Sequence, residues 1–332
     1  MRYHIYGIGN ALVDIEYQVD TEFLNEHGIE KGMMTLVDEQ RQLTLIEALN
    51  KHMIKKQSGG SAANTMIASS QFGANCFYSC KVASDQWGDF YTADLNAAGV
   101  DSNLSLKPRN EGLTGRCLVM ITDDADRTMN TFLGITTEFS TGELVPEALK
   151  DSHWLYIEGY LVANPVSQKT MVAARELADQ HSVKTALTFS DPNMVKFFRK
   201  GFDQVIGSQV DLLFCNEDEA ITYTGVESLA KARDQLKQIA RTFVITQGKN
   251  GAIIFDGDTY IDIEPYPVKA VDTNGAGDMF AGAFLYGITH GHSYAQAGKI
   301  ASLASSRIVS QFGPRLQWHQ AKEVLNYLFK NH

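Results

Sequence analysis

The fold is decided by four short apolar runs: WLYIEG (154–159), TALTFS (185–190), DLLFC (211–215) and TFVIT (242–246). The first residues of these runs lie 31, 26 and 31 residues apart. Each run is apolar throughout rather than alternating, which is typical of strands buried on both faces. Segments of helical period lie between the runs, as at residues 170–181. Strands and helices that alternate at this spacing predict an α/β fold, with helices on both faces of a mostly parallel central sheet.

Two regions, residues 11–37 and about 112–134, break this rhythm and are typical of strands and turns instead. In the second region, alternating segments flank an Asp-rich tip at residues 123–126, which indicates a hairpin. No linker rich in Pro, Gly or Ser separates either region from the rest of the chain. We therefore expect a single domain over residues 1–332, in which the two regions form a small β-sheet lid.

The composition excludes several classes of protein. Of the 332 residues, 44% are hydrophobic, which is too many for an intrinsically disordered chain. The formal net charge of −10 argues against a nucleic-acid partner, because such a partner requires a basic face. No apolar run reaches the roughly 20 residues that a membrane span requires, and the four cysteines form no disulfide framework. We expect a cytoplasmic protein that acts on a small molecule and has no nucleic-acid or membrane partner.

The sharpest motif is DTNGAGDMFAGAF, at residues 272–284. In it, Gly275, Ala276 and Gly277 open a helix and leave backbone N–H groups exposed at the positive end of the helix dipole, where an anion can bind. Asp278 follows in the first turn. A carboxylate there suits a general base that takes a proton from a nucleophile attacking the bound anion. The alternative is an ordinary helix start, but the run as a whole favours the functional interpretation.

A second motif is SGGSAAN, at residues 58–64. Gly59 and Gly60 allow a ligand to approach the backbone closely, and Ser61 can cap the helix that follows. Asn64 lies one turn into that helix and offers both a donor and an acceptor to sugar hydroxyls. A simple turn with a helix cap explains this motif equally well when it is taken alone.

The segment GIGN, at residues 7–10, invites a dinucleotide-binding interpretation. That fingerprint needs Gly or Ala at its sixth position, which is Leu12 here, and a helix after the strand. Residues 13–17 alternate as a strand does, so we reject an NAD-dependent enzyme. Asn10 and Asp14 suit a polyol better, because one carboxylate can accept hydrogen bonds from two hydroxyls.

Asn216 and Glu219 follow the apolar run at 211–215. Ligands bind at the carboxyl ends of parallel strands, and an Asn-x-x-Glu pair at such a place can hold Mg²⁺, often through water. Acidic residues are also common at helix N-termini, because they interact favourably with the helix dipole. The motif alone does not separate these two interpretations.

Taken in order, these four segments resemble the ribokinase (phosphofructokinase-B) family of ATP-dependent carbohydrate and nucleoside kinases. The resemblance covers nearly the whole chain and implies a ribokinase-like three-layer α/β/α fold with a small β-sheet lid. Within the family the chain is most similar to the adenosine kinases, at residues 114–134, 155–160, 189–192 and 210–217. The version Ser-Ala-Ala-Asn at residues 61–64 is common in sugar kinases as well.

The resemblance implies a role for each matching residue. It makes Asp278 the general base on the 5′-hydroxyl of the substrate and places Arg127 over the phosphates. The implied anion hole consists of Gly275, Ala276 and Gly277. The implied substrate-binding residues are Asn10, Asp14, Gly59, Gly60 and Asn64. The implied ATP-binding residues are Asn216, Thr246, Gly248 and Gly277. Asn216 and Glu219 are implied to organise Mg²⁺ through water.

Some relatives use a monovalent cation such as K⁺ beside the anion hole. Asp272 and residues 306–313 occupy the matching place in this chain. The sequence therefore leaves a monovalent cation open as a further cofactor, beside ATP and Mg²⁺.

The leading expectation is phosphorylation of the 5′-hydroxyl of a nucleoside, with adenosine converted to AMP in purine salvage. The alternative is a sugar kinase of the ribose or fructose type in the same family. A regulator that binds its ligand without catalysis is disfavoured, because Asp278 and the run at 275–277 are intact. The chain is expected to be a monomer or a homodimer.

Overall fold

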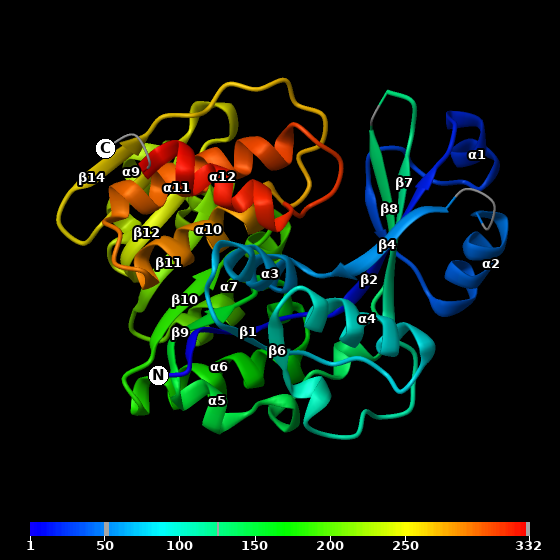
Figure 1. The fold of residues 1–332 in the computed structure, drawn as a ribbon, viewed down its shortest axis with the longest axis horizontal. Coiled ribbons are helices and arrows are strands. Elements are labelled where there is room, and N and C mark those ends of the chain that lie inside the picture. Colours follow the sequence, from blue (N-terminus) through cyan, green and yellow to red (C-terminus); the bar gives the residue numbers. More distant parts are fainter. Residues whose placement is uncertain (50–52, 125, 330–332) are drawn as a thin grey trace.

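The computed structural model describes residues 1–332 except 50–52, 125 and 330–332. A large body carries both ends of the chain, and a small sheet with two helices stands beside it (Figure 1). Among the described residues, no helix is both long and apolar enough to cross a membrane.

The large body is built on a sheet with the strand order β14-β13-β12-β11-β10-β9-β1-β5-β6. The strands from β12 to β6 pair in parallel, whereas β13 and β14 pair antiparallel at one edge. The expected mostly parallel sheet is therefore confirmed. Its strands are β1 (Tyr3–Ile8), β5 (Cys76–Ser79), β6 (Val100–Ser102), β9 (Ser152–Ile157), β10 (Lys184–Thr188), β11 (Val210–Asn216), β12 (Ala240–Thr246), β13 (Ala252–Phe255) and β14 (Tyr260–Ile263).

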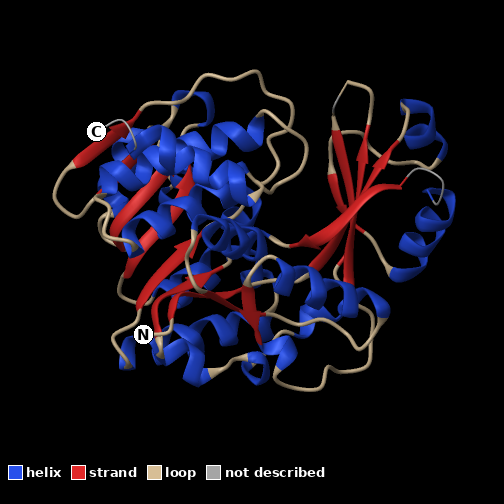
Figure 2. Cartoon of the chain, viewed as in Figure 1, coloured by secondary structure: helices blue, strands red, loops and turns tan. Residues whose placement is uncertain are grey.

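Helices cover both faces of this sheet, so the body has three layers (Figure 2). Along one strand, Tyr156 packs into the core on one face, and its neighbours Leu155 and Ile157 pack into the core on the other. The first core includes α3 (Ser61–Phe72), α4 (Gln86–Ala97), α10 (Ala276–Thr289), α11 (Tyr294–Val309) and α12 (Trp318–Phe329). The second core includes α5 (Pro146–Lys150), α6 (Pro165–Gln180), α7 (Pro192–Ile206), α8 (Glu217–Thr224) and α9 (Leu229–Leu236). Short 3₁₀ helices lie at Asn103–Ser105, Gly134–Glu138, Thr141–Glu143, Gly159–Ala163 and Gly248–Asn250.

The small sheet has the strand order β3-β8-β7-β2-β4. Its elements are β2 (Leu12–Gln18), β3 (Met34–Leu36), β4 (Met53–Gly59), β7 (Gly115–Ile121) and β8 (Arg127–Phe132), with α1 (Thr21–Glu26) and α2 (Glu39–Leu49). The two regions expected from the sequence contribute four of these strands, but the analysis omitted β4. It also missed α1 inside residues 11–37. Strands β7 and β8 form the expected antiparallel pair, while Ala125, in the Asp-rich tip, lies outside the described residues.

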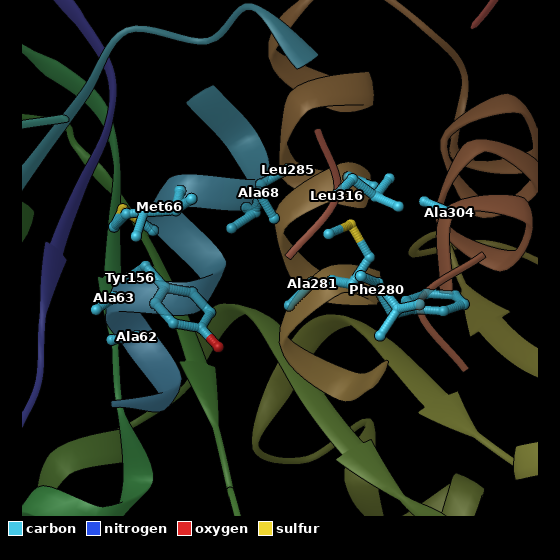
Figure 3. Packing of buried hydrophobic residues seen from close by; sticks show 14 of the residues in the cluster. Ala62, Ala63, Met66, Ala68, Tyr156, Phe280, Ala281, Leu285, Ala304 and Leu316 are labelled. Carbon is cyan, nitrogen blue, oxygen red and sulfur yellow. The ribbon is translucent and has the colours of Figure 1, made fainter. Parts of the chain in front are cut away.

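Helices α3 and α10 pack side by side through small residues. Ala68 lies on the side of α3 that faces α10, and Ala281 belongs to the same core on α10 (Figure 3). A Cβ added to Gly282 would lie 2.6 Å from the Cβ of Ala68, so the close approach of the helices depends on glycine there. This packing brings together the first turns of two helices that are more than 200 residues apart in the chain.

Candidate active site

Asp278 lies at the meeting point of these two first turns. Helix α10 begins after Gly275, which has φ +74° and whose added Cβ would lie 2.3 Å from Cβ of Pro314. The Asp278 carboxylate accepts hydrogen bonds from Ser61 Oγ at 2.6 Å and Asn64 Nδ2 at 3.2 Å. Burial raises the pKa of Asp278 to about 6, against the lowering effect of these two bonds. A half-buried carboxylate with a pKa near neutrality is suited to general-base chemistry.

The expectation that Ser61 caps helix α3 is wrong. The N-cap residue is Gly60, with φ +100°, and Ser61 is the first helical residue. The reason is a close approach of the backbone, because a Cβ on Gly60 would lie 2.2 Å from the carbonyl oxygen of Asn10. The Ser61 hydroxyl is thereby left to bind Asp278 instead of its own helix.

A cavity of about 470 Å³ opens beside the start of α10. Ala276 and Gly277 line it at the helix N-terminus, and Thr246 and Gly248 line it at the end of β12. A Cβ added to Gly277 would meet nothing within 4 Å, so the backbone there faces open space. The other walls of the cavity include Pro267, Val268, Phe280 and Val309. Apolar walls next to a helix N-terminus without a side-chain cap fit a nucleotide, with its base on the walls and its phosphates at the helix. Of the sequence-predicted ATP residues, Asn216 is not among the lining residues.

The sequence-predicted polyol residues do not line this cavity, although Asn64 binds Asp278 and Asp14 lies near it. The Asp14 carboxylate covers Gly59 so closely that a Cβ there would lie 2.2 Å from Oδ2 of Asp14. Burial raises the pKa of Asp14 to about 7, and nearby Arg315 lowers it in part. Asn64 Oδ1 is buried and has no hydrogen-bond partner among the described residues. An unpaired buried acceptor and a half-buried carboxylate are suited to a ligand that carries several hydroxyl groups.

Glu158 belongs to this site, although the sequence analysis assigned it no role. Its carboxylate accepts hydrogen bonds from Asn10 Nδ2 at 2.9 Å and from the N–H of Ala62 at 2.8 Å, and burial raises its pKa to about 7. A Cβ on Gly9 would lie 2.5 Å from this carboxylate, which explains the glycine without any nucleotide. The available signal was an acid directly after the apolar strand β9, at the edge where ligands bind.

Arg315 is the second residue that the sequence analysis missed. Its guanidinium contacts Asp94 Oδ2 at 2.8 Å and the hydroxyl of Ser58 at 2.7 Å. It thereby ties the segment after Gly313 and Pro314 to strand β4 of the small sheet. Only the arginine after a Gly-Pro turn was visible in the sequence, and that pattern indicates no particular partner.

Asn216 and Glu219 form a reciprocal helix cap at the start of α8. Asn216 Oδ1 accepts from the N–H of Glu219 at 2.8 Å, while the Glu219 carboxylate accepts from the N–H and from Nδ2 of Asn216, both at 2.9 Å. Burial raises the pKa of Glu219 to about 7. No group of three His, Cys, Asp or Glu side chains with metal-binding geometry occurs among the described residues. One buried carboxylate fits Mg²⁺ only as part of a shell that waters and phosphates complete.

Arg127 contacts Asp272 rather than the Asp-rich tip beside it. Nη2 of Arg127 lies 2.5 Å from Oδ2 of Asp272, and the two side chains are only 10% and 2% exposed. Asp272 also accepts hydrogen bonds from the N–H groups of Asn274 at 3.0 Å and Gly313 at 2.9 Å. A monovalent cation at Asp272 would therefore compete with the Arg127 guanidinium for this carboxylate.

The pfkB carbohydrate kinase family model matches residues 31–321, so the chain belongs to this family. A solved structure of a probable sugar kinase from Rhizobium etli has a TM-score of 0.88, with 31% identity over 99% of both chains. Adenosine kinase from Sinorhizobium meliloti has a TM-score of 0.86, with 32% identity over 97% of this chain and 99% of that one. Adenosine kinase from Schizosaccharomyces pombe is 25% identical over 87% of this chain and 89% of that protein. The expected fold and family are confirmed, and the chain is a kinase of the nucleoside or sugar type.

Proposed function

We propose that the protein transfers a phosphoryl group from ATP to the 5′-hydroxyl of a nucleoside, and that this nucleoside is adenosine. The observation that carries the proposal is the Asp278 carboxylate, held by Ser61 and Asn64 beside the N–H groups that open α10. A base, an anion site and a group of hydroxyl-binding side chains meet there. The similarity to adenosine kinases from two organisms supports adenosine as the acceptor.

In this mechanism Asp278 accepts the proton of the 5′-hydroxyl as that oxygen attacks phosphorus. The N–H groups of Gly275, Ala276 and Gly277 stabilise the charge that develops on the phosphoryl oxygens. Asp14 and Asn64 hold the ribose hydroxyls and so fix the distance between the attacking oxygen and its target.

ATP, when bound, supplies the phosphoryl group, and Mg²⁺ neutralises its charge. Thr246 and Gly248 are proposed to line the nucleotide site. Asn216 and Glu219 are proposed to hold the metal ion through water. The product would be AMP, as in purine salvage, and the cytoplasm is the proposed compartment.

The small sheet is proposed to act as a lid over a single kinase domain. Closing the site excludes water, which would otherwise compete with the hydroxyl as an acceptor. The proposed assembly is a monomer or a homodimer, since nothing in the proposed chemistry needs a second chain.

A sugar kinase of the ribose or fructose type is the second candidate. Two observations favour it: the similarity to the Rhizobium etli probable sugar kinase and the Ser-Ala-Ala-Asn sequence at residues 61–64. A free sugar would use the same hydroxyl-binding residues, so only measurement of the acceptor separates the two functions.

The test is ADP release in a coupled assay, with adenosine, other nucleosides, ribose and fructose as acceptors. We expect adenosine to give the highest kcat/KM. Asp14→Ala should raise the acceptor KM at least about tenfold and leave the ATP KM within about threefold, because a buried partner for hydroxyls is lost. The matched control is Asp123→Ala, which removes an exposed carboxylate of the small sheet and should change neither constant. A higher kcat/KM for fructose or ribose would replace adenosine with a sugar.

A further inference from the structure

We propose that Asp272 is a positioning residue for Arg127, and that it holds the guanidinium beside the anion hole when the small sheet closes. The proposal rests on the proposed phosphoryl transfer. It concerns an ion pair that joins the small sheet to the loop before α10, two parts of the chain that are 145 residues apart.

The Asp272 carboxylate is held in place by its own surroundings. Its two oxygens accept from the N–H groups of Asn274 and Gly313. The backbone N–H groups of Val271 and Asp272 both donate to the carbonyl oxygen of Val309. These bonds all lie within the large body, so the carboxylate is fixed without any contribution from the small sheet. The Asp272 carboxylate is thus positioned to pair with a cation from another part of the chain.

Arg127 supplies this cation from the small sheet. It is the first residue of β8, and its backbone N–H donates to its neighbour Asp126 at 3.0 Å. Its side chain could have paired with the acids of the hairpin tip, which would have been worth roughly 0–1 kcal/mol at an exposed surface. It instead crosses to Asp272, where both partners are shielded from water. An ion pair shielded in this way depends on good geometry, because both charges have lost their hydration.

The guanidinium keeps donors free after it has docked. All three guanidinium nitrogens of Arg127 are buried and make no hydrogen bond among the described residues, so the contact of Nη2 with Asp272 is an ion pair. Buried donors without an acceptor are costly, so their presence indicates that an acceptor enters the site during function. Phosphoryl oxygens match a planar guanidinium fork, and the proposed anion hole begins three residues after Asp272.

The charges around the site make this docking useful. Burial raises the pKa of Asp14, and the nearby carboxylates of Glu16 and Asp278 raise it further. Arg127 lowers the pKa of Asp14, so its charge reaches the acceptor side of the site. Without the arginine, an anionic phosphoryl group would meet these carboxylates with less compensation. Asp272 thus acts through Arg127 and does not itself touch the reacting atoms.

The test is a double-mutant cycle of Asp272→Asn and Arg127→Ala. Asparagine keeps the size of Asp272 and one acceptor oxygen, so its structural cost should be the same in both backgrounds. With Arg127 present, Asp272→Asn should lower kcat about 10- to 100-fold, because a buried charged donor loses its ionic partner, and leave the nucleoside KM within about threefold. In the Arg127→Ala background the same change should lower kcat less than about threefold. Equal losses in both backgrounds would overturn the proposal and leave Asp272 with a purely structural role.

A control variant and a hydrogen-exchange measurement separate the proposed role of Asp272 from a general structural effect. Lys31→Ala removes an exposed ion pair with Asp124 at the tip of the small sheet and should leave kcat unchanged. Hydrogen exchange of the β8 amides in the free protein should be faster in Asp272→Asn than in the unmodified protein, because the docked arginine holds β8. Unchanged exchange would also contradict the proposal. This readout needs no turnover, whereas lack of adenosine turnover in the unmodified enzyme would contradict only the proposed function.

Discussion

Helices α8 and α10 each carry a carboxylate three residues after the N-cap: the buried Glu219 in the first and the half-buried Asp278 in the second. Burial raises both pKa values, to about 7 and about 6. In α8 the cap is Asn216, and the glutamate folds back onto it in a reciprocal pair of hydrogen bonds. In α10 the cap is Gly275, which has no side chain, so the aspartate receives its hydrogen bonds from another helix.

The two carboxylates therefore differ in role: Glu219 caps its own helix, whereas Asp278 is available to a ligand in the proposed mechanism. Glu219 stabilises α8 by satisfying the donors at its start. The N–H groups at the start of α10 have no side-chain cap, and Asp278 does not fold back onto them. In the proposed mechanism, the glycine at the cap distinguishes the anion site of α10 from the ordinary helix start of α8.

Of these changes, Asp278→Asn is expected to have the largest effect on turnover. Turnover should fall by about 10² to 10⁴, because a positioned base is lost while size and helix position are kept. The melting temperature should change by only a few degrees, which differential scanning calorimetry can check. Steady-state turnover within tenfold of the unmodified enzyme would exclude Asp278 as the base.

Glu219→Gln tests the other helix start. The substituted side chain would place an NH2 group where one carboxylate oxygen now accepts a hydrogen bond from Asn216. The free energy of unfolding should therefore fall by about 0.5–2 kcal/mol. If Glu219 also organises the metal, the Mg²⁺ concentration for half-maximal activity should rise several-fold. Asp218→Asn is the matched control, since it removes an exposed charge from the same helical turn. An unchanged Mg²⁺ requirement in Glu219→Gln would leave this residue with the cap alone.

Ser61→Ala should shift the pH dependence of catalysis. The Ser61 hydrogen bond stabilises the charged form of Asp278 and lowers its pKa, so removal of the bond raises that pKa above about 6. The acid limb of kcat/KM should move to higher pH by up to about one unit. The control is Ser69→Ala, whose hydroxyl also joins α3 to α10 but bonds Gly282 O at 2.8 Å, away from Asp278. A shift in both variants would point to helix packing rather than to the base.

Replacement of K⁺ by tetramethylammonium should have the smallest effect. Asp272 already faces Arg127 and two backbone N–H groups, so neither kcat nor the melting temperature should change. A rise in melting temperature with K⁺ concentration, or activation of several-fold, would show that the loop before α10 does bind the cation.

The large sheet was predictable because its strands are buried on both faces. Burial on both faces requires continuous apolar runs, and such runs are visible in any one stretch of the chain, as in β9 and β11. Strand β4 was missed for the opposite reason. Its sequence, MIKKQSG, is mostly polar and mostly exposed, and it becomes a strand only by pairing with β2 at the edge of the small sheet.

The sequence predicted which motif residues belong to the site, but it did not predict which residues they contact. Gly275–Gly277 and Asp278 could be recognised because a helix start is a local structure, written in consecutive residues. The assignment of Ser61 as a cap failed because the competing partner, Asp278, lies 217 residues away. Glu158 went unassigned for the same reason, since its partner Asn10 lies 148 residues away.

The sequence by itself determined the alternation of strands and helices, the glycine-capped start of α10 and the presence of a carboxylate in its first turn. These features depend on neighbouring residues and on the apolar period of each segment. Only the tertiary structure decided that Asp278 meets Ser61 and Asn64, and that Arg127 meets Asp272 instead of the acids beside it. Such contacts follow from the packing of α3 against α10 and from the position of the small sheet. Hydrogen bonds and ion pairs form between whichever groups that packing brings within reach and shields from water.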